Sequence, residues 1–146
     1  MQSAEINQYL QKVFTGIFHL ERQVSWPFVS IIGRAAFTPV ENNIFLFDEW
    51  GVYELNGQKQ SFYQQRFFVF QQDVFLIQKN NRSPLHMFPY ADAQKQKSFV
   101  FLHQHLCGKD VYKVSLEILD KNVFHMNYNV VSPRNPYKVL SSYRKD

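Results

Sequence analysis

The segment HLCGKDVY, residues 105–112, places four chemically versatile side chains close together in the sequence. Histidine transfers protons near neutral pH, a cysteine thiolate is a nucleophile, and aspartate and tyrosine hold or orient protons. His105, Cys107, Asp110 and Tyr112 are therefore candidate catalytic residues and candidate ligand-binding residues. The alternative is a hydrogen-bonded plug at the tip of a hairpin, in which Asp110 accepts turn amides and Tyr112 fills space.

The pair Gly108-Lys109 predicts how these side chains are oriented. Glycine in the first central position favours a two-residue type II′ turn, which places Cys107 opposite Asp110. Behind the turn, the same register pairs His105 with Tyr112, His103 with Val114, Phe101 with Leu116 and Phe99 with Ile118. This face begins apolar and ends polar, so we predict that it lines a barrel interior, with Asp110 as the anionic neighbour of Arg66. A shift of one residue would turn these side chains outward.

Hydrophobic periodicity predicts the elements that position these residues. Ser3 can cap a helix over residues 4–15, whose apolar positions fall at helical spacing. After this helix the period changes to two, and turn residues separate the segments. The predicted strands are 17–25, 30–38, 43–50, 61–71, 73–79, 85–89, 98–107, 110–119, 122–131 and 136–144.

The short connections between these strands indicate the fold class. Strands joined by tight turns pair antiparallel, because a parallel pair needs a long crossover connection. A chain of 146 residues with 17% aromatic residues fits one domain with one core. An antiparallel sheet removes its exposed edges by closing on itself. We therefore predict a single, mainly all-β domain over residues 1–146: a lipocalin-like up-and-down antiparallel β-barrel of about 8–10 strands with a short N-terminal α-helix.

Three charged residues fall on the apolar faces of their predicted strands. Arg22, Glu49 and Arg66 each alternate in phase with neighbouring phenylalanines. An unpaired charge inside a barrel is costly, so these residues either form an Arg–Glu network or contact a ligand. Both hold if one arginine keeps donors free for a carboxylate or phosphate.

Two histidines, His103 and His105, lie two positions apart on one predicted strand. This spacing permits metal ligation, but the sequence does not identify a third ligand. We therefore expect no metal site and no cofactor. For Cys107, the alternative to a nucleophile is a half-buried side chain that packs as a small apolar residue.

Several motifs in the C-terminal half resemble a known family. They are H-x-C-x-x-D-x-Y at residues 105–112, Pro-Arg-x-x-Tyr at residues 133–137 and a closing Tyr143-Arg144. Together with FHLERQV, GRAAF, FDEWG and QQRFFVF, and with RSPLHMF, which retains His86, they are similar to the uncharacterised domain-of-unknown-function family 6314 over nearly the whole chain. The resemblance implies a calycin-like barrel and no established activity.

A shorter motif, TGIF at residues 15–18, resembles the Gly-x-Trp motif of lipocalins with phenylalanine in place of tryptophan. In those proteins a late arginine covers the tryptophan. The resemblance therefore implies that Arg144 covers Phe18 through a cation–π contact.

Charge and hydropathy argue against several classes of partner. The formal charge is +4 and the pI about 9.2, but the basic residues are scattered, which argues against a nucleic-acid partner. No apolar run reaches about 18 residues, so we expect no membrane span. One cysteine is typical of a reducing compartment, and we expect a cytoplasmic monomer or homodimer.

The leading hypothesis is a barrel that binds a small amphipathic molecule with a polar or anionic head. The candidate ligand-binding residues are Arg22, Glu49, Arg66, His86, His103, His105, Cys107, Asp110, Tyr112, Tyr128 and Arg144. The alternative is a small acid–base enzyme of isomerase or hydrolase type, in which His105 and Asp110 carry protons and Tyr112 orients the substrate.

Overall fold

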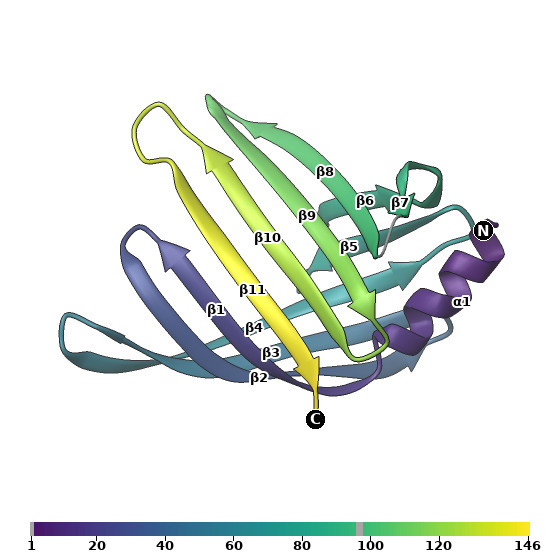
Figure 1. The fold of residues 1–146 in the computed structure, drawn as a ribbon, viewed down its shortest axis with the longest axis horizontal. Coiled ribbons are helices and arrows are strands. Elements are labelled where there is room, and N and C mark those ends of the chain that lie inside the picture. Colours follow the sequence, from purple (N-terminus) through teal and green to yellow (C-terminus); the bar gives the residue numbers. More distant parts are fainter. Residues whose placement is uncertain (1, 96–97) are drawn as a thin grey trace.

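One helix and a continuous antiparallel sheet make up the part of the chain that the computed structural model describes, residues 2–95 and 98–146 (Figure 1). The elements are α1 (Ser3–Val13), β1 (Gly16–Ser25), β2 (Phe28–Glu41), β3 (Ile44–Leu55), β4 (Gln58–Phe70), β5 (Val74–Lys79), β6 (Pro84–Pro89), the 3₁₀ helix η1 (Tyr90–Asp92), β7 (Gln94–Lys95), β8 (Phe99–Cys107), β9 (Asp110–Asp120), β10 (Val123–Val131) and β11 (Tyr137–Lys145). The sheet curls into a nearly closed barrel, which confirms the predicted fold class.

The strands pair in the order β6-β5-β4-β3-β2-β1-β11-β10-β9-β8-β7, and all the ladders are antiparallel. This is an up-and-down meander, except that β1 also pairs with β11 and so joins the two halves of the sheet. The predicted strands agree with β1–β6 and β8–β11 to within three residues at most ends. The two-residue strand β7 was not predicted.

The β8–β9 hairpin has the predicted register. Cys107 pairs with Asp110, His105 with Tyr112, and the ladder continues to Phe99 opposite Ile118. Gly108 has φ of 63°, as the first central residue of a type II′ turn requires. The turn chemistry therefore identified the pairing correctly.

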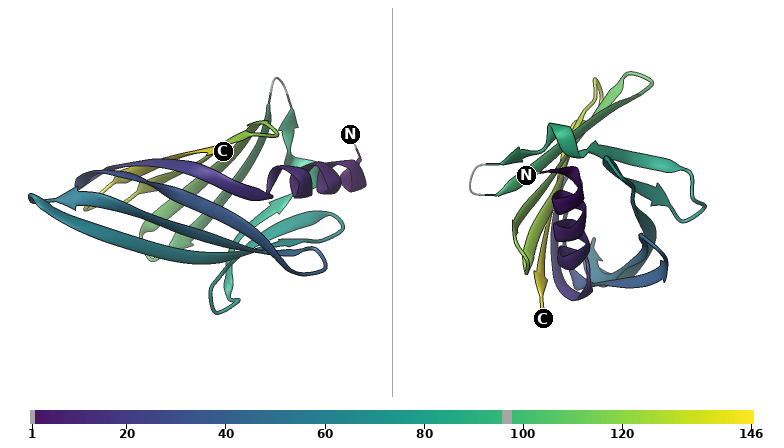
Figure 2. Two further views of the ribbon diagram at one scale, coloured as in Figure 1. Left: turned by 90° about the horizontal axis from the view of Figure 1, so that it is seen from below. Right: turned by 90° about the vertical axis from the view of Figure 1, so that its right-hand side faces the viewer.

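The helix α1 lies across one end of the barrel (Figure 2). It begins one residue earlier than predicted, so Ser3 is its first residue, and the backbone nitrogen of Gln2 donates to Glu5 Oε1 at 3.4 Å. Ile6, Leu10 and Val13 are buried at helical spacing and face the barrel. The helix thus covers this end with its apolar side.

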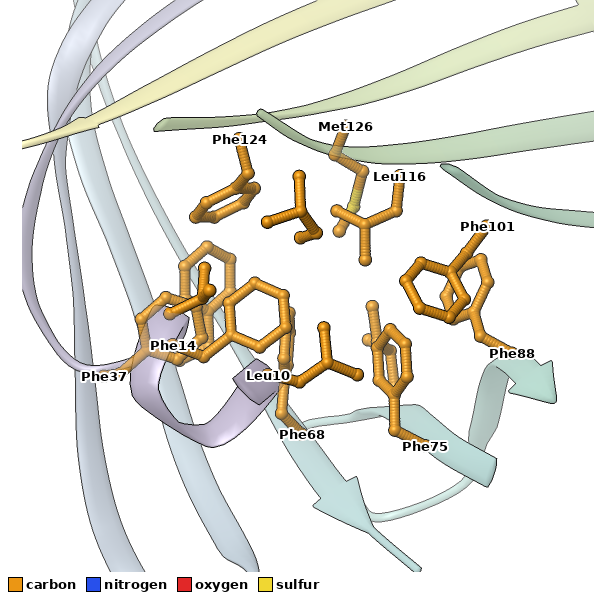
Figure 3. Packing of buried hydrophobic residues seen from close by; sticks show 14 of the residues in the cluster. Leu10, Phe14, Phe37, Phe68, Phe75, Phe88, Phe101, Leu116, Phe124 and Met126 are labelled. Atoms are coloured by element: carbon orange, nitrogen blue, oxygen red, sulfur yellow. The ribbon is translucent and has the colours of Figure 1, made fainter. Parts of the chain in front are cut away.

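An aromatic core fills the barrel below α1. Phe14 is fully buried, and its ring centroid lies 5.1 to 5.2 Å from those of Phe37, Phe68 and Phe124. Figure 3 shows Leu10 and Phe14 between Phe124 on one side of the barrel and Phe68 on the other. Close aromatic pairs of this kind make the helix end a packed, apolar region.

In the part of the chain that the structure describes, the barrel has a seam between β6 and β8. These strands lie against each other, but among the described residues no backbone ladder joins them. Side chains cross the seam instead: the ring centroids of Phe88 and Phe101 are 6.2 Å apart, and those of His86 and His103 are 5.4 Å apart. The closure of the barrel therefore depends here on side-chain contacts.

Candidate functional site: a polar cavity in the open end of the barrel

A cavity of about 360 Å³ occupies the interior at the end away from α1. Its lining comes from β1, β3–β6 and β8–β11 and combines polar, aromatic and aliphatic side chains. The lining residues are Arg22, Val24, Phe47, Glu49, Gln64, Arg66, Phe68, Ile77, Leu85, His86, His105, Tyr112, Met126, Tyr128, Tyr137, Val139, Ser141 and Tyr143. The volume is within the range of small-molecule sites, about 300 to 1,000 Å³.

The predicted Arg–Glu network is present at one side of this cavity. Arg22 Nη2 donates to Glu49 Oε2 at 2.6 Å and to the Tyr143 hydroxyl at 2.8 Å, and Arg22 Nε donates to Ser141 Oγ at 2.7 Å. The Tyr143 hydroxyl donates to the same carboxylate, and Gln64 Nε2 donates to Glu49 Oε1 at 3.2 Å. Glu49 is 1% exposed, so these donors replace the water that its charge has lost.

The electrostatics of this network hold Arg22 as a cation. Burial disfavours the charge of Arg22, but Tyr143 and Glu49 outweigh burial and raise the pKa of the guanidinium above its ordinary value. Burial, followed by the Glu49 charge, raises the pKa of the Tyr143 phenol well above its usual range. The network is therefore a charged Arg–Glu pair with a neutral tyrosine donor.

Arg66 differs from Arg22 because it has no ionic partner in the described part of the chain. Its Nη1 donates to the backbone oxygen of Gln65 at 2.9 Å, and its buried Nε has no hydrogen-bond partner among the described residues. The cavity is thus lined by one arginine whose charge is neutralised and one whose charge is not. A buried donor without a partner carries a free-energy penalty that an acceptor on a ligand would remove.

The expected contact between Arg66 and Asp110 does not form. Asp110 lies at the rim, where it lines a separate surface hollow with Lys109, Arg134 and Tyr137. Cys107 is exposed and does not line the cavity. The prediction that all four hairpin residues project inward is therefore wrong for Cys107 and Asp110, because the hairpin continues past the rim of the barrel.

The other half of that prediction is confirmed in position. His105 and Tyr112 both line the cavity, and their rings stack at a centroid distance of 4.9 Å with an interplanar angle of 2°. Within the described chain, His105 Nδ1 is buried without a hydrogen-bond partner. Among residues 2–95 and 98–146, no hydrogen bond joins His105 to Asp110, so the geometry does not assemble the acid–base pair of the alternative hypothesis.

A third histidine completes a cluster that the sequence did not reveal. His86 on β6 faces His103 on β8 across the seam, with 3.3 Å between their Nδ1 atoms. The other ring nitrogen of His86, Nε2, lies 2.7 Å from the Tyr128 hydroxyl. That hydroxyl donates a hydrogen bond to Met126 Sδ at 3.9 Å. Of the predicted ligand-binding residues here, His86 and Tyr128 line the cavity, whereas His103 is not a lining residue and is hydrogen-bonded to His86.

Burial sets the charge state of this histidine cluster. His86 is 3% exposed, and burial, followed by the charges of His103, His105 and Arg66, lowers its pKa to about 3. Burial, followed by His105, also lowers the pKa of His103, and burial raises the pKa of Tyr128 to about 12. His86 and Tyr128 are therefore neutral at physiological pH.

Arg144 does not have the position that the lipocalin resemblance implied. It is exposed, and the buried Tyr143 next to it takes the inward position of β11. Lys145, which has the same strand parity as Tyr143, places its Nζ 5.4 Å from the centroid of the Phe18 ring instead. The expected inward position was therefore wrong by one residue, and neighbouring residues in a strand point to opposite sides of the sheet.

Several lining residues were not among the predicted site residues. Tyr137, Val139, Ser141 and Tyr143 alternate along β11 and all line the cavity. The sequence shows that these four residues alternate with a period of two. If Tyr143 is assigned to the inner side of β11, the other three follow, because every second residue of a strand faces the same side. Gln64 has the same strand parity as Arg66, so the signal that identified Arg66 applied to it as well, whereas Gln65 faces Asp48 on the other side of the sheet.

Three solved structures with similar folds are distant in sequence. The S-type phycobiliprotein lyase CPES from Guillardia theta has a TM-score of 0.59 at 7% identity, covering 100% of this chain and 93% of that one. EF1p2_mFAP2b bound to DFHBI has a TM-score of 0.54 at 7% identity, covering 96% and 98%. A de novo designed fluorescence-activating β-barrel has a TM-score of 0.50 at 10% identity, covering 100% of both chains. At these identities the similarity establishes the barrel fold alone.

Sequence comparison places the chain in a family. A search of curated proteins finds no significant match. No helix of the described residues has the length and apolar character needed to cross a membrane. The model of DUF6314, a family of unknown function, matches residues 14–145, in agreement with the motif resemblance. The chain therefore belongs to the DUF6314 family.

Proposed function

We propose that this protein binds a small amphipathic molecule whose anionic head contacts Arg66 and whose apolar part lies against the floor of the cavity. The observation that carries the proposal is the buried Nε of Arg66, unpaired within the described chain, in a cavity of about 360 Å³. A carboxylate or phosphate oxygen would satisfy this donor and neutralise a charge that no group of the described residues neutralises.

The distribution of polar and apolar lining supports the amphipathic character of the ligand. Arg66, His105 and Tyr112 supply polar groups to the lining, whereas Phe47, Phe68 and Met126, which also belong to the buried core, supply its apolar part, the floor of the cavity. Glu49 does not repel an anion from the cavity, because its charge is held by Arg22. A ligand with a polar head and an apolar tail matches both parts.

The structural neighbours add a second line of support. EF1p2_mFAP2b is a barrel of similar fold bound to DFHBI, and CPES is a phycobiliprotein lyase. A barrel of this shape can therefore bind an organic molecule, and DFHBI is a useful probe of the cavity.

The test uses decanoic acid and its uncharged analogue decanol as probes. We expect thermal-shift and native mass spectrometry measurements to detect decanoic acid at lower concentrations than decanol, because only the acid has a carboxylate for Arg66. Arg66→Met should weaken decanoic acid binding by at least about tenfold, equivalent to 1.4 kcal/mol, and leave decanol binding unchanged.

Arg144→Met is the matched control, because Arg144 is exposed on the outer side of β11 and should not affect binding. Equal binding of acid and alcohol to the wild type, or equal losses in the Arg66 and Arg144 variants, would contradict the anion role. DFHBI competing with decanoic acid would indicate that both probes bind in the cavity.

A further inference from the structure

We propose that His86, His103 and His105 form a three-histidine site for a divalent late first-row metal ion, such as zinc or cobalt, with an open coordination position toward the cavity. The three residues offer nitrogen atoms that all lie within 4.8 Å of one another. Imidazole is a preferred ligand of these ions, and three protein ligands with a free position are typical of catalytic rather than structural zinc.

The spacing of the first two histidines matches the geometry of a tetrahedral centre. Metal–nitrogen bonds of about 2.0 to 2.1 Å at tetrahedral angles separate the nitrogen atoms by about 3.3 to 3.4 Å. The Nδ1 atoms of His86 and His103 are 3.3 Å apart. The ligand atom of His105 lies within 4.8 Å of the other two, and its side chain must rotate to reach the same separation, which its partial exposure allows.

The surrounding hydrogen bonds orient His86 as a ligand. The Tyr128 hydroxyl donates to Met126 Sδ and can therefore accept a hydrogen bond from His86 Nε2 at 2.7 Å. In that tautomer the lone pair of Nδ1 faces His103. A metal-bound histidine usually donates its second ring nitrogen to a partner in this way, which fixes the orientation of the ring.

His105 supplies the third ligand and the connection to the cavity. Its buried Nδ1 has no hydrogen-bond partner in the described chain, and its ring stacks on that of Tyr112. Because His86 and His105 line the cavity, a fourth ligand would come from the cavity side. A metal here would also join β6 to β8, where backbone hydrogen bonds are missing from the described part of the sheet.

The charges around the cluster determine what else the metal would bind. Among the described residues the cluster has no carboxylate ligand, since Glu49 is held by Arg22, and Arg66 adds a positive charge to the same cavity. This arrangement opposes a bare divalent ion and favours an ion that carries an anion at its fourth position. We therefore expect metal affinity to rise when a small anion such as azide is present.

The experiment is a titration of the untagged, metal-free chain of residues 1–146 with cobalt(II) and zinc(II), without added organic ligand. We expect one equivalent of tightly bound cobalt with the visible absorption of four- or five-coordinate nitrogen ligation, displaced by zinc. Azide should change this spectrum, because it occupies the open position.

His103→Ala and His105→Ala are the test variants, since both side chains are partly exposed and their removal leaves the aromatic core intact. Each should weaken cobalt binding by at least about tenfold. His125→Ala is the matched control, because His125 lies outside the cluster beside Glu117 and should leave the titration unchanged.

The proposal is overturned if the wild type binds less than one equivalent, if the control loses as much affinity as the test variants, or if His103→Ala and His105→Ala both bind like the wild type. Zinc should also raise the thermal midpoint of the wild type, and the midpoint of His105→Ala should not rise. Metal binding is measured without decanoic acid, and decanoic acid binding with metal-free protein, so failure of one proposal is distinct from failure of the other.

Discussion

The two ends of the barrel interior are built from the same strands but contain different chemistry. At the helix end, Phe14 is fully buried, and its ring packs against those of Phe37, Phe68 and Phe124. At the open end, the same strands carry Arg22, Glu49, Arg66 and His86 at inward positions around a cavity. One set of strands therefore supplies a packed core at one end and a polar site at the other.

This difference separates stability from recognition. Apolar packing at the helix end stabilises the fold without any requirement for a ligand. The open end buries charged and polar groups, which costs free energy unless every group has a partner, and in the described chain Arg66 Nε and His105 Nδ1 have none. The buried Tyr90 hydroxyl, in the 3₁₀ helix that contacts α1, has no hydrogen-bond partner among the described residues either. Unsatisfied groups of this kind are typical of functional sites.

The largest effect on stability is expected at the helix end. Phe14→Ala removes a ring that contacts Phe37, Phe68 and Phe124, and leaves a cavity in a packed region. The free energy of unfolding should fall by about 3 to 5 kcal/mol, measured by urea denaturation. Ile17→Ala is the control, because Ile17 is 50% exposed and should change stability by about 0.5 kcal/mol or less. Similar values for the two variants would contradict this account of the helix end.

A smaller loss is expected from the charged network at the open end. Glu49→Ala leaves Arg22 buried without an ionic partner in the described chain, with hydrogen bonds to Ser141 and Tyr143 and a cation–π contact with Phe62. Because 13% of the Arg22 side chain remains exposed, the loss should lie near the lower limit for a broken buried pair, about 3 kcal/mol. Replacing both partners, as Arg22→Met with Glu49→Leu, should recover most of this loss in the same denaturation experiment. A double variant no more stable than the single one would contradict the pairwise account.

Arg66 should behave in the opposite way to Glu49. Arg66→Met removes an unpaired charge and a buried donor, so the free energy of unfolding should stay constant or rise by about 1 kcal/mol. A stabilising change at Arg66, the residue proposed to contact the anionic head of a ligand, would distinguish it from the structural network around Glu49. A loss of about 2 kcal/mol or more would instead assign Arg66 to the structural network.

The fold was predictable from the sequence because its signals are local and repeated. Strand periodicity and turn residues such as Gly108 identified most strand bounds and the register of the β8–β9 hairpin. Strand parity also identified Arg22, Glu49 and Arg66 as inward residues, and all three line the cavity. These predictions depend on the two-residue alternation within a strand and on the turn that joins two consecutive strands, and both can be read from the local sequence.

The site was less predictable because it depends on contacts across the barrel and on where the barrel ends. Strand parity shows the side of the sheet, but it does not show that Cys107 and Asp110 extend past the rim. The distance between His86 and His103 depends on the closure of the seam, where no ladder in the described residues sets a register. Expecting no metal site rested on a missing third ligand, and the closed barrel brings His86 beside the other two histidines.

The smallest stability effect is expected for Asp110, and this sharpens the comparison between a carboxylate inside the barrel and one at its rim. Asp110 is partly exposed and takes part in no ion pair of the described chain, so Asp110→Ala should change the free energy of unfolding by about 0.5 kcal/mol or less, against about 3 kcal/mol for Glu49→Ala. A second readout comes from Tyr137, whose pKa is raised by burial, then by Tyr112 and then by Asp110. Loss of the Asp110 charge should lower the pKa of Tyr137 in an ultraviolet titration, because a neighbouring anion disfavours the phenolate. A loss of about 3 kcal/mol or more in urea denaturation of Asp110→Ala would restore the buried Arg66–Asp110 pair that the hairpin register first indicated, and would remove the distinction between interior and rim.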